Sequence, residues 1–386
     1  MNDPPFTSIH AFSSFPTTPE GKIDWSCIEN YFGENATKMS QTPQDPMWHA
    51  EGDVWTHTKM VCETLIELPG WNELQVLDRI KIFLAALLHD VGKPNCTKTE
   101  NGRIISPKHA VKGSQLARQF LWQKGWAGKS DSHIKIREDI VSFVRFHSVP
   151  YQLFNHYDPL KTVAEISVHI PLRLLALLSE ADLRGRIDNN IGQSQEKVAW
   201  FREFAEENYC WDQPYPFTSD YSRYAYFSGV LEHPSQTLYD STWGEVILMS
   251  GLPASGKDMY IKEHFPHLPE ISLDAIRQKM KIEWLEDQTP VINTARELAK
   301  DFLRKKQPFV WNATNLLRLF RQQIIRLCDN YNARVKIVYV ETEFPTLLQR
   351  NCNRMNPVDE SVYDKMLGKI EFPTRCEVPN IEYVVT

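Results

Sequence analysis

The chain has 386 residues, of which 42% are hydrophobic and 24% are charged, and its formal net charge is −6. This length allows two domains with separate cores, and the composition is ordinary for a globular protein. The negative charge excludes a generic nucleic-acid binder, so any contact with a polyanion has to come from local Lys and Arg clusters.

The cysteines and the hydropathy pattern indicate the compartment. Seven scattered cysteines without a CxxC pair favour free thiols in a reducing cytosol over a disulfide framework. Residues 1–22 lack a basic segment followed by an apolar run, so we expect no signal peptide. No apolar run approaches ~20 residues, so we expect no membrane partner. We therefore expect a cytoplasmic protein.

The first half of the chain is predicted to be mainly helical. Residues 1–45 are predicted to form an extended arm with a first helix near 25–31. Apolar residues then recur at spacings of three and four, which predicts helices over 56–67, 77–89, 110–125, 136–146 and 172–182. Residues 208–243, rich in Tyr, Pro and Ser, are predicted to form a connector. We expect a helical domain with its arm and connector over residues 1–240.

The pattern changes at Glu245 to an alternation of strands and helices. Short apolar runs predict strands over 246–250, 270–272, 309–311 and 334–340. Helices are predicted near 259–264, from 274 onward, near 293–304 and over 317–331. This alternation predicts an α/β domain over 241–386, with a parallel sheet flanked by helices.

Histidine and aspartate residues stand near the ends of the predicted helices of the first half. His57 lies early on one helix, His89 and Asp90 end an apolar helix, and Asp182 ends another. Two neutral imidazoles and two carboxylates suit a divalent transition metal and leave positions open for water and phosphate. Such an ion would lower the pKa of a water molecule and neutralise phosphate charge. A lone His-Asp pair would indicate only capping and hydrogen bonding, but the full set favours a hydrolase site.

The order His, His-Asp, Asp resembles the HD phosphohydrolase superfamily over about residues 45–205. His109 and His147 match the positions at which two-metal members add ligands. The resemblance therefore implies one or two divalent transition metals. A role for these two histidines in contacting substrate phosphate, or as plain surface residues, stays open.

Several cations and polar residues near these positions are further candidates. A guanidinium pairs two phosphate oxygens at once, so candidate phosphate ligands are Lys93, Arg145, Arg184 and Arg186. For any one of these four cations a surface salt bridge is the favoured alternative. Lys93 is the strongest candidate among them, because it lies one turn past the His-Asp pair. His49 and Asp53 precede the first ligand and are either supporting groups or ordinary loop residues.

The segment from Gly251 to Lys257 fits the pattern G-x-x-x-x-G-K between a predicted strand and a predicted helix. Gly251 and Gly256 let backbone N–H groups turn toward the phosphates of a nucleotide, and Lys257 reaches the same oxygens. Ser255 lies within the loop. Asp258 replaces the Ser or Thr whose hydroxyl usually binds Mg²⁺, so its carboxylate binds the ion directly, through water, or not at all. The pattern predicts binding of ATP or another NTP together with Mg²⁺.

Three later motifs narrow the chemistry to phosphoryl transfer. They are D-x-x-R at Asp274 and Arg277, N-x-T-N at Asn312 and Asn315, and R-x-x-x-R at Arg350 and Arg354. An Asp at a helix start can accept the proton of an attacking hydroxyl, and an Arg beside it can hold an acceptor phosphate. The two asparagines can line the acceptor or nucleotide pocket, and two arginines on one helix face can cover the phosphates as a lid. Helix capping by Asp274 and a solvated basic face are the alternatives.

These motifs occur in the order seen in polynucleotide 5′-kinases, which the chain from about residue 245 onward resembles. The resemblance implies that Lys257 binds the β- and γ-phosphates, Asp274 is the general base and Arg277 binds the 3′-phosphate of the acceptor nucleotide. Arg350 and Arg354 would be lid arginines on the donor. Asn312 stands where relatives often have Asp.

The combination resembles the bacterial HD-Pnk family of RNA end-healing enzymes over most of the chain. The resemblance implies that the kinase phosphorylates 5′-OH ends from ATP. The HD domain would remove a 2′,3′-cyclic, 2′- or 3′-phosphate from the other end. RNA or DNA ends are then the substrates, and the enzyme would act before a separate RNA ligase; the oligomeric state stays open. The alternatives are an HD nucleotide hydrolase fused to a small-molecule or nucleoside kinase, and an ATP-sensing regulator of the HD site, which Asp258 favours.

Overall fold

The computed structural model describes residues 22–126, 129–188, 191–283, 285–354 and 357–386. The predicted arm up to residue 21 lies outside this range. The chain divides into two compact units. The first unit consists of Met1–Trp126 and Lys135–Pro216, and the second consists of Ala127–Ile134 and Phe217–Thr386. This division precedes the predicted boundary near residue 240, because α11 (Asp220–Phe227) buries Tyr224 in the core of the second unit.

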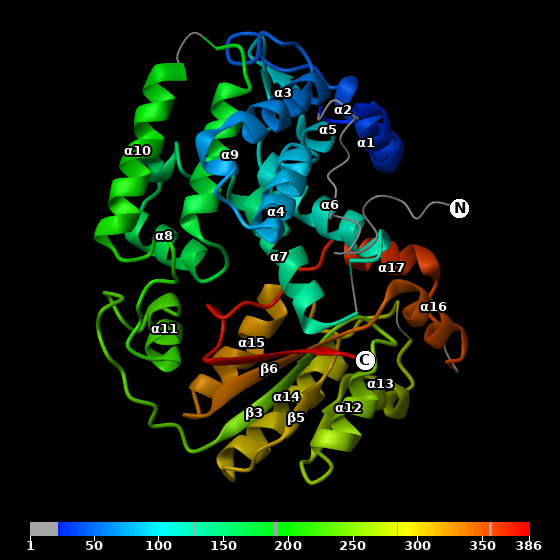
Figure 1. The fold of residues 1–386 in the computed structure, drawn as a ribbon. Coiled ribbons are helices and arrows are strands. Elements are labelled where there is room, and N and C mark those ends of the chain that lie inside the picture. Colours follow the sequence, from blue (N-terminus) through cyan, green and yellow to red (C-terminus); the bar gives the residue numbers. More distant parts are fainter. Residues whose placement is uncertain (1–21, 127–128, 189–190, 284, 355–356) are drawn as a thin grey trace. The chain divides into compact units, whose positions relative to one another are not determined.

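The first half of the chain is helical, as predicted (Figure 1). Its α-helices are α1 (Trp25–Phe32), α2 (Glu34–Ser40), α3 (Val54–Glu67), α4 (Val76–Leu88), α5 (Lys93–Cys96), α6 (His109–Gln123), α7 (Asp131–Phe146), α8 (Pro159–Ser167), α9 (Leu172–Arg184) and α10 (Ile191–Glu207). The 3₁₀ turns η2 (Pro69–Trp71) and η3 (Leu153–Asn155) and the antiparallel hairpin β1 (Lys98–Glu100) and β2 (Arg103–Ile105) complete it. The hairpin escaped prediction because its strands are short and exposed.

Helix α4 is the centre of the first core. All residues from Ile80 to Leu88 are buried, which fits a helix surrounded by other helices on every side. Helix α3 begins where the Asp53 carboxylate accepts hydrogen bonds from the backbone N–H groups of Trp55 and Thr56. Within the described residues no single helix is long and apolar enough to cross a membrane; the bent pair α8 and α9, at 108°, passes by length and composition alone.

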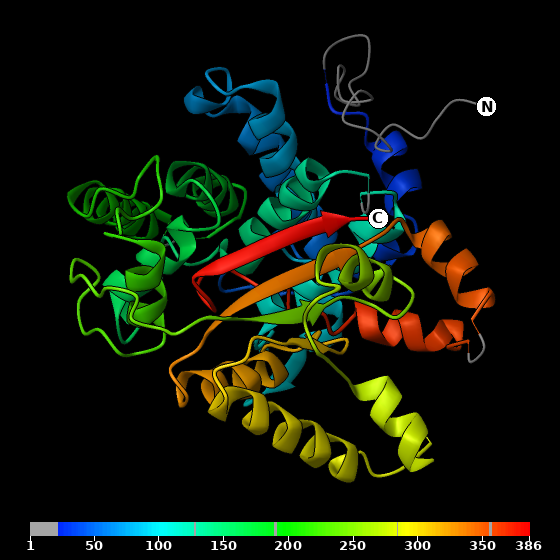
Figure 2. The same ribbon diagram turned by 90° about the horizontal axis from the view of Figure 1, so that it is seen from below.

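The second unit contains a five-stranded parallel sheet in the order β4-β5-β3-β6-β7 (Figure 2). Its strands are β3 (Glu245–Ser250), β4 (Glu270–Ser272), β5 (Val310–Asn312), β6 (Arg334–Glu341) and β7 (Asn380–Val385). After α11 its helices are α12 (Lys257–His264), α13 (Leu273–Met280), α14 (Thr289–Arg304), α15 (Arg318–Asp329), α16 (Phe344–Cys352) and α17 (Glu360–Leu367). The predicted α/β fold with helices against a parallel sheet is confirmed.

Strand β3 shows why helices cover both faces of this sheet. Successive side chains of a strand point to opposite faces. Val246 and Leu248 belong to the core cluster that holds residues of α14 and α15, whereas Ile247 and Met249 belong to the cluster with residues of α12. The glycine loop follows β3 at the carboxyl edge of the sheet, between β5 and β6, which is where open α/β sheets bind ligands.

Candidate metal centre and phosphate loop

The six predicted metal ligands converge in the first unit. Their positions are His57 on α3, His89 and Asp90 directly after α4, His109 at the start of α6, His147 directly after α7, and Asp182 on α9. All are buried except His109, which is partly exposed. Residues that are far apart in the sequence are therefore collected at one place by the ends of four helices and the first turn of α3.

The candidate ligand atoms lie close enough to one another to bind a shared ion. His57 Nε2 is 3.1 Å from Asp182 Oδ1 and 3.3 Å from His89 Nε2, and His89 Nε2 is 3.1 Å from Asp90 Oδ2. Among the six predicted ligands, atoms within 4.8 Å of one another form one group of His57, His89 and Asp90 and another of Asp90, His109 and His147; His49 and Glu51 form a further group with His57. Because Asp90 belongs to both groups, the residues could hold two adjacent ions with this carboxylate in common.

The hydrogen bonds of the histidines favour metal binding. In four of them the Nδ1 atom is bonded to a backbone carbonyl: Gly185 for His57 (3.2 Å), Ala86 for His89 (2.6 Å), Ser106 for His109 (2.8 Å) and Val144 for His147 (2.8 Å). A carbonyl only accepts, so Nδ1 carries a proton in each ring, and a neutral ring then has the lone pair of Nε2 available for an ion. Asp90 Oδ1 is buried without a hydrogen-bond partner in the described chain. These donors therefore fit a divalent ion.

The charges of the cluster also suit a cation. Burial lowers the pKa of His147 to about 3 and lowers the pKa of His109. Burial alone would raise the pKa of Asp90 and of Asp182, but neighbouring cations outweigh it and hold both pKa values well below the usual range. Near neutral pH the cluster therefore offers ionised carboxylates and two neutral imidazoles.

Gly92 explains how α6 comes close enough to bring His109 to Asp90. A Cβ atom at Gly92 would lie 2.2 Å from the carbonyl oxygen of His109 and 2.5 Å from the backbone nitrogen of Gly113. Only glycine permits this approach of two backbones. His109 Nε2 thereby lies 3.5 Å from Asp90 Oδ1.

The predicted phosphate-binding cations have different surroundings. Lys93 Nζ is 2.7 Å from Asp90 Oδ2, and Arg186 Nη2 is 2.6 Å from Asp182 Oδ1. Both cations therefore border the cluster. Arg184 instead pairs with Glu180 on the surface, and Arg145 lies over the Phe146 ring at 5.5 Å. Within the described chain, these two make no hydrogen bond or ion pair with the six ligand residues.

Glu51 is a site residue that the sequence reasoning missed. Its buried carboxylate lies 2.8 Å from His49 Nδ1 and 3.0 Å from His57 Nδ1, and it accepts a hydrogen bond from the backbone N–H of Ile187. It therefore orients the His57 ring from the Nδ1 side. Its position in the sequence, between His49 and Asp53, was the signal that could have identified it. Of these two neighbours, Asp53 caps α3 and has no contact of this kind with His57.

The glycine loop has the backbone of a phosphate-binding loop. Gly251 has φ 147° and Gly256 has φ 98°; a Cβ atom at Gly251 would lie 2.3 Å from the Val340 carbonyl oxygen. Lys257 Nζ donates hydrogen bonds to the carbonyls of Gly251 and Leu252 at 3.0 and 2.7 Å. The lysine is therefore folded onto its own loop. When a nucleotide binds, its phosphate oxygens would take the place of these two carbonyls as acceptors for the Lys257 amine.

The D-x-x-R motif lies at the start of α13, near the glycine loop. Ser272, rather than Asp274, caps this helix, because its hydroxyl accepts the Ala275 N–H. Asp274 is instead 2.5 Å from Arg277 Nη1, and its charge acts on Lys257. Asp274 is thus largely exposed and free of the capping role that was the alternative.

The prediction that Arg350 and Arg354 share one helix face is wrong. Helix α16 ends at Cys352, and the Arg354 N–H donates to the Asn351 carbonyl in a tight turn beyond it. Both arginines nevertheless border the loop. Arg350 Nη1 donates to Thr386 Oγ1, which donates to the Ser255 carbonyl. Arg354 acts electrostatically on Lys257.

The two asparagines of the N-x-T-N motif have different partners. Asn315 is buried, and its amide donates to the Met249 carbonyl at 2.7 Å. Its side chain therefore holds β3 next to the loop that follows β5. Asn312, the last residue of β5, donates from Nδ2 to Asp258 Oδ1 at 2.7 Å and to Glu270 Oε1 at 2.8 Å.

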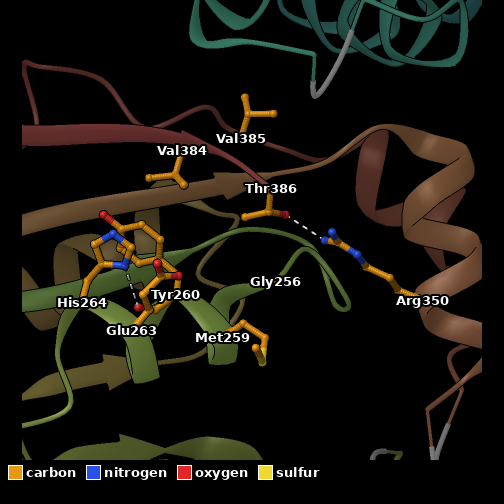
Figure 3. A pocket seen from close by; sticks show the side chains of 9 residues that line it. All are labelled: Gly256, Met259, Tyr260, Glu263, His264, Arg350, Val384, Val385 and Thr386. Atoms are coloured by element: carbon orange, nitrogen blue, oxygen red, sulfur yellow. Dashed lines mark hydrogen bonds between the residues drawn. The ribbon is translucent and has the colours of Figure 1, made fainter.

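A pocket of about 540 Å³ lies beside the glycine loop (Figure 3). Its lining includes Gly256, Arg350 and Thr386, and the stacked rings of Tyr260 and His264, whose centroids are 4.0 Å apart. The pocket is therefore continuous with the phosphate-binding loop and offers aromatic and aliphatic surfaces next to one cation.

Comparison with known proteins agrees with this division. Residues 54–181 match the family model of the HD domain, and residues 246–373 match the model described as an AAA domain. A candidate kinase from Chloroflexus aurantiacus is similar at 17% identity and a TM-score of 0.32, over 36% of this chain and 87% of that one; this similarity is too distant to carry an argument. The chain thus joins a region that matches the HD domain and holds the His/Asp cluster to a C-terminal α/β region that matches the AAA domain and holds the phosphate loop.

Proposed function

We propose that this protein is a bifunctional RNA end-healing enzyme. In this proposal the P-loop domain transfers the γ-phosphate of ATP to a 5′-OH end. The HD domain removes a 2′,3′-cyclic, 2′- or 3′-phosphate from the other end. The observation that carries the proposal is the presence of two candidate phosphate sites on one chain. One is the buried His/Asp cluster, and the other is the glycine loop, near which lie Asp274, with its partner Arg277, and the arginines Arg350 and Arg354.

In the HD domain the side chains would bind the divalent ion, orient its ligands and supply positive charge for the phosphate. A divalent ion at the cluster, when bound, activates water and offsets phosphate charge. Lys93 and Arg186 lie beside the carboxylates at 2.7 and 2.6 Å and are the cations placed to meet phosphate oxygens. Tyr151 donates to Asp182 Oδ2 at 3.0 Å and fixes that carboxylate.

In the kinase domain the residues divide into donor and acceptor groups. Lys257 would leave the loop carbonyls for the β- and γ-phosphates, and Arg350 and Arg354 would stabilise charge on the transferred group. Asp274 would accept the proton of the attacking 5′-hydroxyl, while its partner Arg277 binds an acceptor phosphate. The pocket of Figure 3 would receive the nucleoside of the donor.

The test uses one RNA oligomer with a 5′-OH and a 2′,3′-cyclic phosphate. It is incubated with γ-labelled ATP, Mg²⁺ and a panel of transition metals, and both ends are resolved. Label at the 5′ end with loss of the cyclic phosphate supports the proposal, and a DNA oligomer tests the choice of polynucleotide. Label that moves only to free nucleosides would contradict the proposal and indicate a small-molecule kinase. ATP binding without transfer to any acceptor would indicate a regulator.

The affinity for nucleotide is expected to fall as the pH rises above about 8. Burial, opposed by Asp258 and Asp274 and helped by Arg354, lowers the pKa of Lys257 to about 8. Bound phosphates favour the protonated amine, so binding takes up a proton above this pH and weakens by up to about tenfold per pH unit, whereas it is constant below it. Calorimetry with ADP at pH 9, in buffers of different ionisation enthalpy, measures the proton uptake.

Lys257→Arg provides the control, because a guanidinium stays charged throughout this range. Its ADP affinity should not change between pH 7 and 9, even if it is weaker overall. Absence of proton uptake by the unsubstituted protein at pH 9 would contradict this prediction, because a neutral Lys257 that is protonated on contact with the phosphates must take up a proton.

A further inference from the structure

The side chain that follows the phosphate-loop lysine contacts the end of a neighbouring strand. Asp258 lies in the first turn of α12, and its Oδ1 accepts a hydrogen bond of 2.7 Å from Asn312 Nδ2 at the end of β5. Strand β5 pairs directly with β3, which leads into the loop. A favourable position at a helix N-terminus accounts for an acid in this turn, but it does not account for the contact with β5.

These are the two positions from which P-loop proteins hold Mg²⁺. The usual pair is a Ser or Thr hydroxyl after the lysine and an Asp carboxylate on a neighbouring strand. Here the residue after the lysine is Asp258 and the strand residue is Asn312. Each pair combines one negative charge with one neutral polar side chain, and a carboxylate oxygen is a ligand that Mg²⁺ accepts.

The hydrogen bonds of Asn312 determine the orientation of its amide. Its Nδ2 atom lies 2.7 Å from Asp258 Oδ1 and 2.8 Å from Glu270 Oε1. A carboxylate only accepts, so the atom between the two acids is the NH₂ group and the carbonyl oxygen is the one turned away from them. Glu270 thus acts as a positioning residue that holds Asn312 beside Asp258.

We propose that the two positions have exchanged charge, so that the carboxylate that binds Mg²⁺ in the kinase comes from Asp258 on α12, while Asn312 on β5 positions this carboxylate through its N–H donor. The inference rests on the ATP site of the proposed function and specifies its charged metal ligand. It has a direct consequence for binding. A carboxylate beside the nucleotide repels the phosphates unless Mg²⁺ lies between them, so ADP affinity should depend on Mg²⁺ more strongly than with a hydroxyl at residue 258.

The experiment measures ADP affinity of the full chain by calorimetry, with Mg²⁺ or with EDTA. We expect Mg²⁺ to strengthen binding by about tenfold or more in the unsubstituted protein, from the Coulomb energy of one charge near the phosphates. Asp258→Ser should reduce this ratio to about threefold or less, chiefly because affinity in EDTA improves. The double variant Asp258→Ser with Asn312→Asp restores the usual pair and should recover the ratio.

The single variant Asn312→Asp completes the cycle. It places a third carboxylate against Asp258 and Glu270 and should weaken ADP binding in EDTA further. Asp258→Asn, which removes the charge with almost no change of shape, separates a lost charge from a disturbed fold, and Asp301→Ser on α14 is the exposed acidic control. Thermal unfolding of each variant verifies that it is folded.

Two results would overturn the exchange. One is an unchanged Mg²⁺ ratio in Asp258→Ser and Asp258→Asn; the other is a folded double variant that binds ADP in EDTA but does not recover the ratio. ADP binding requires no polynucleotide, so failure to phosphorylate RNA leaves this measurement valid. Conversely, RNA phosphorylation with an unchanged ratio would reject the exchange and leave the proposed function standing.

Discussion

Lys257→Ala is expected to lower 5′-phosphorylation by about a thousandfold or more, since single cationic or donor groups on a transferring phosphate contribute effects of this order. The lysine is the buried cation of the glycine loop, and its two carbonyl partners belong to that loop. Alanine leaves the loop glycines intact but removes the charge. Removal of the cyclic phosphate by the HD domain should stay within about twofold, which end analysis of the same oligomer measures.

Lys262→Ala is the matched control for this variant. Lys262 lies on the same helix, α12, but it is exposed, so both activities should be retained. Loss of both activities in a folded Lys257→Ala protein would contradict the view that the two sites work independently.

Asp90→Asn is expected to have the opposite effect. The amide keeps the shape of the side chain but removes the charge that belongs to both groups of candidate ligands. It also leaves Lys93, at 2.7 Å, without its buried counter-charge. We expect loss of phosphohydrolase activity by about a thousandfold, the order lost with a catalytic electrostatic group, and a lower metal content by atomic absorption. The kinase should stay within about twofold.

Two further variants define what this result means. His89→Ala should reproduce it, because His89 belongs to the same ligand group. Asp212→Asn, at an exposed acid paired with Arg173, should leave metal content and both activities unchanged. Full metal content together with full hydrolysis in Asp90→Asn would exclude the His/Asp cluster as the hydrolytic site.

Local patterns predicted most of the long elements. Helix α4 and strand β3 each contain a continuous apolar run, and the structure begins and ends them within one residue of the predicted bounds. The short strands β1 and β2 were not predicted, because three residues are too few to show a period. Helix α11 was not predicted, because it lies in the stretch rich in Tyr, Pro and Ser that was assigned to a connector. The turn after α16 was also not predicted. An arginine spacing of four is compatible with a helix, but α16 ends at Cys352, and the Arg354 N–H donates to the Asn351 carbonyl in a turn.

The sequence by itself determined that the chain contains two different folds, and it predicted which residues belong to the two candidate sites. Motifs such as His-Asp and G-x-x-x-x-G-K combine residue type with local geometry, and both are properties of neighbouring residues. Only the tertiary structure decided which residues these side chains contact. Gly92 against His109 and Asn312 between Asp258 and Glu270 are contacts between separate elements, and Glu51 contacts His57 from the loop that precedes α3. They depend on how helices and strands pack, and sequence spacing does not specify that.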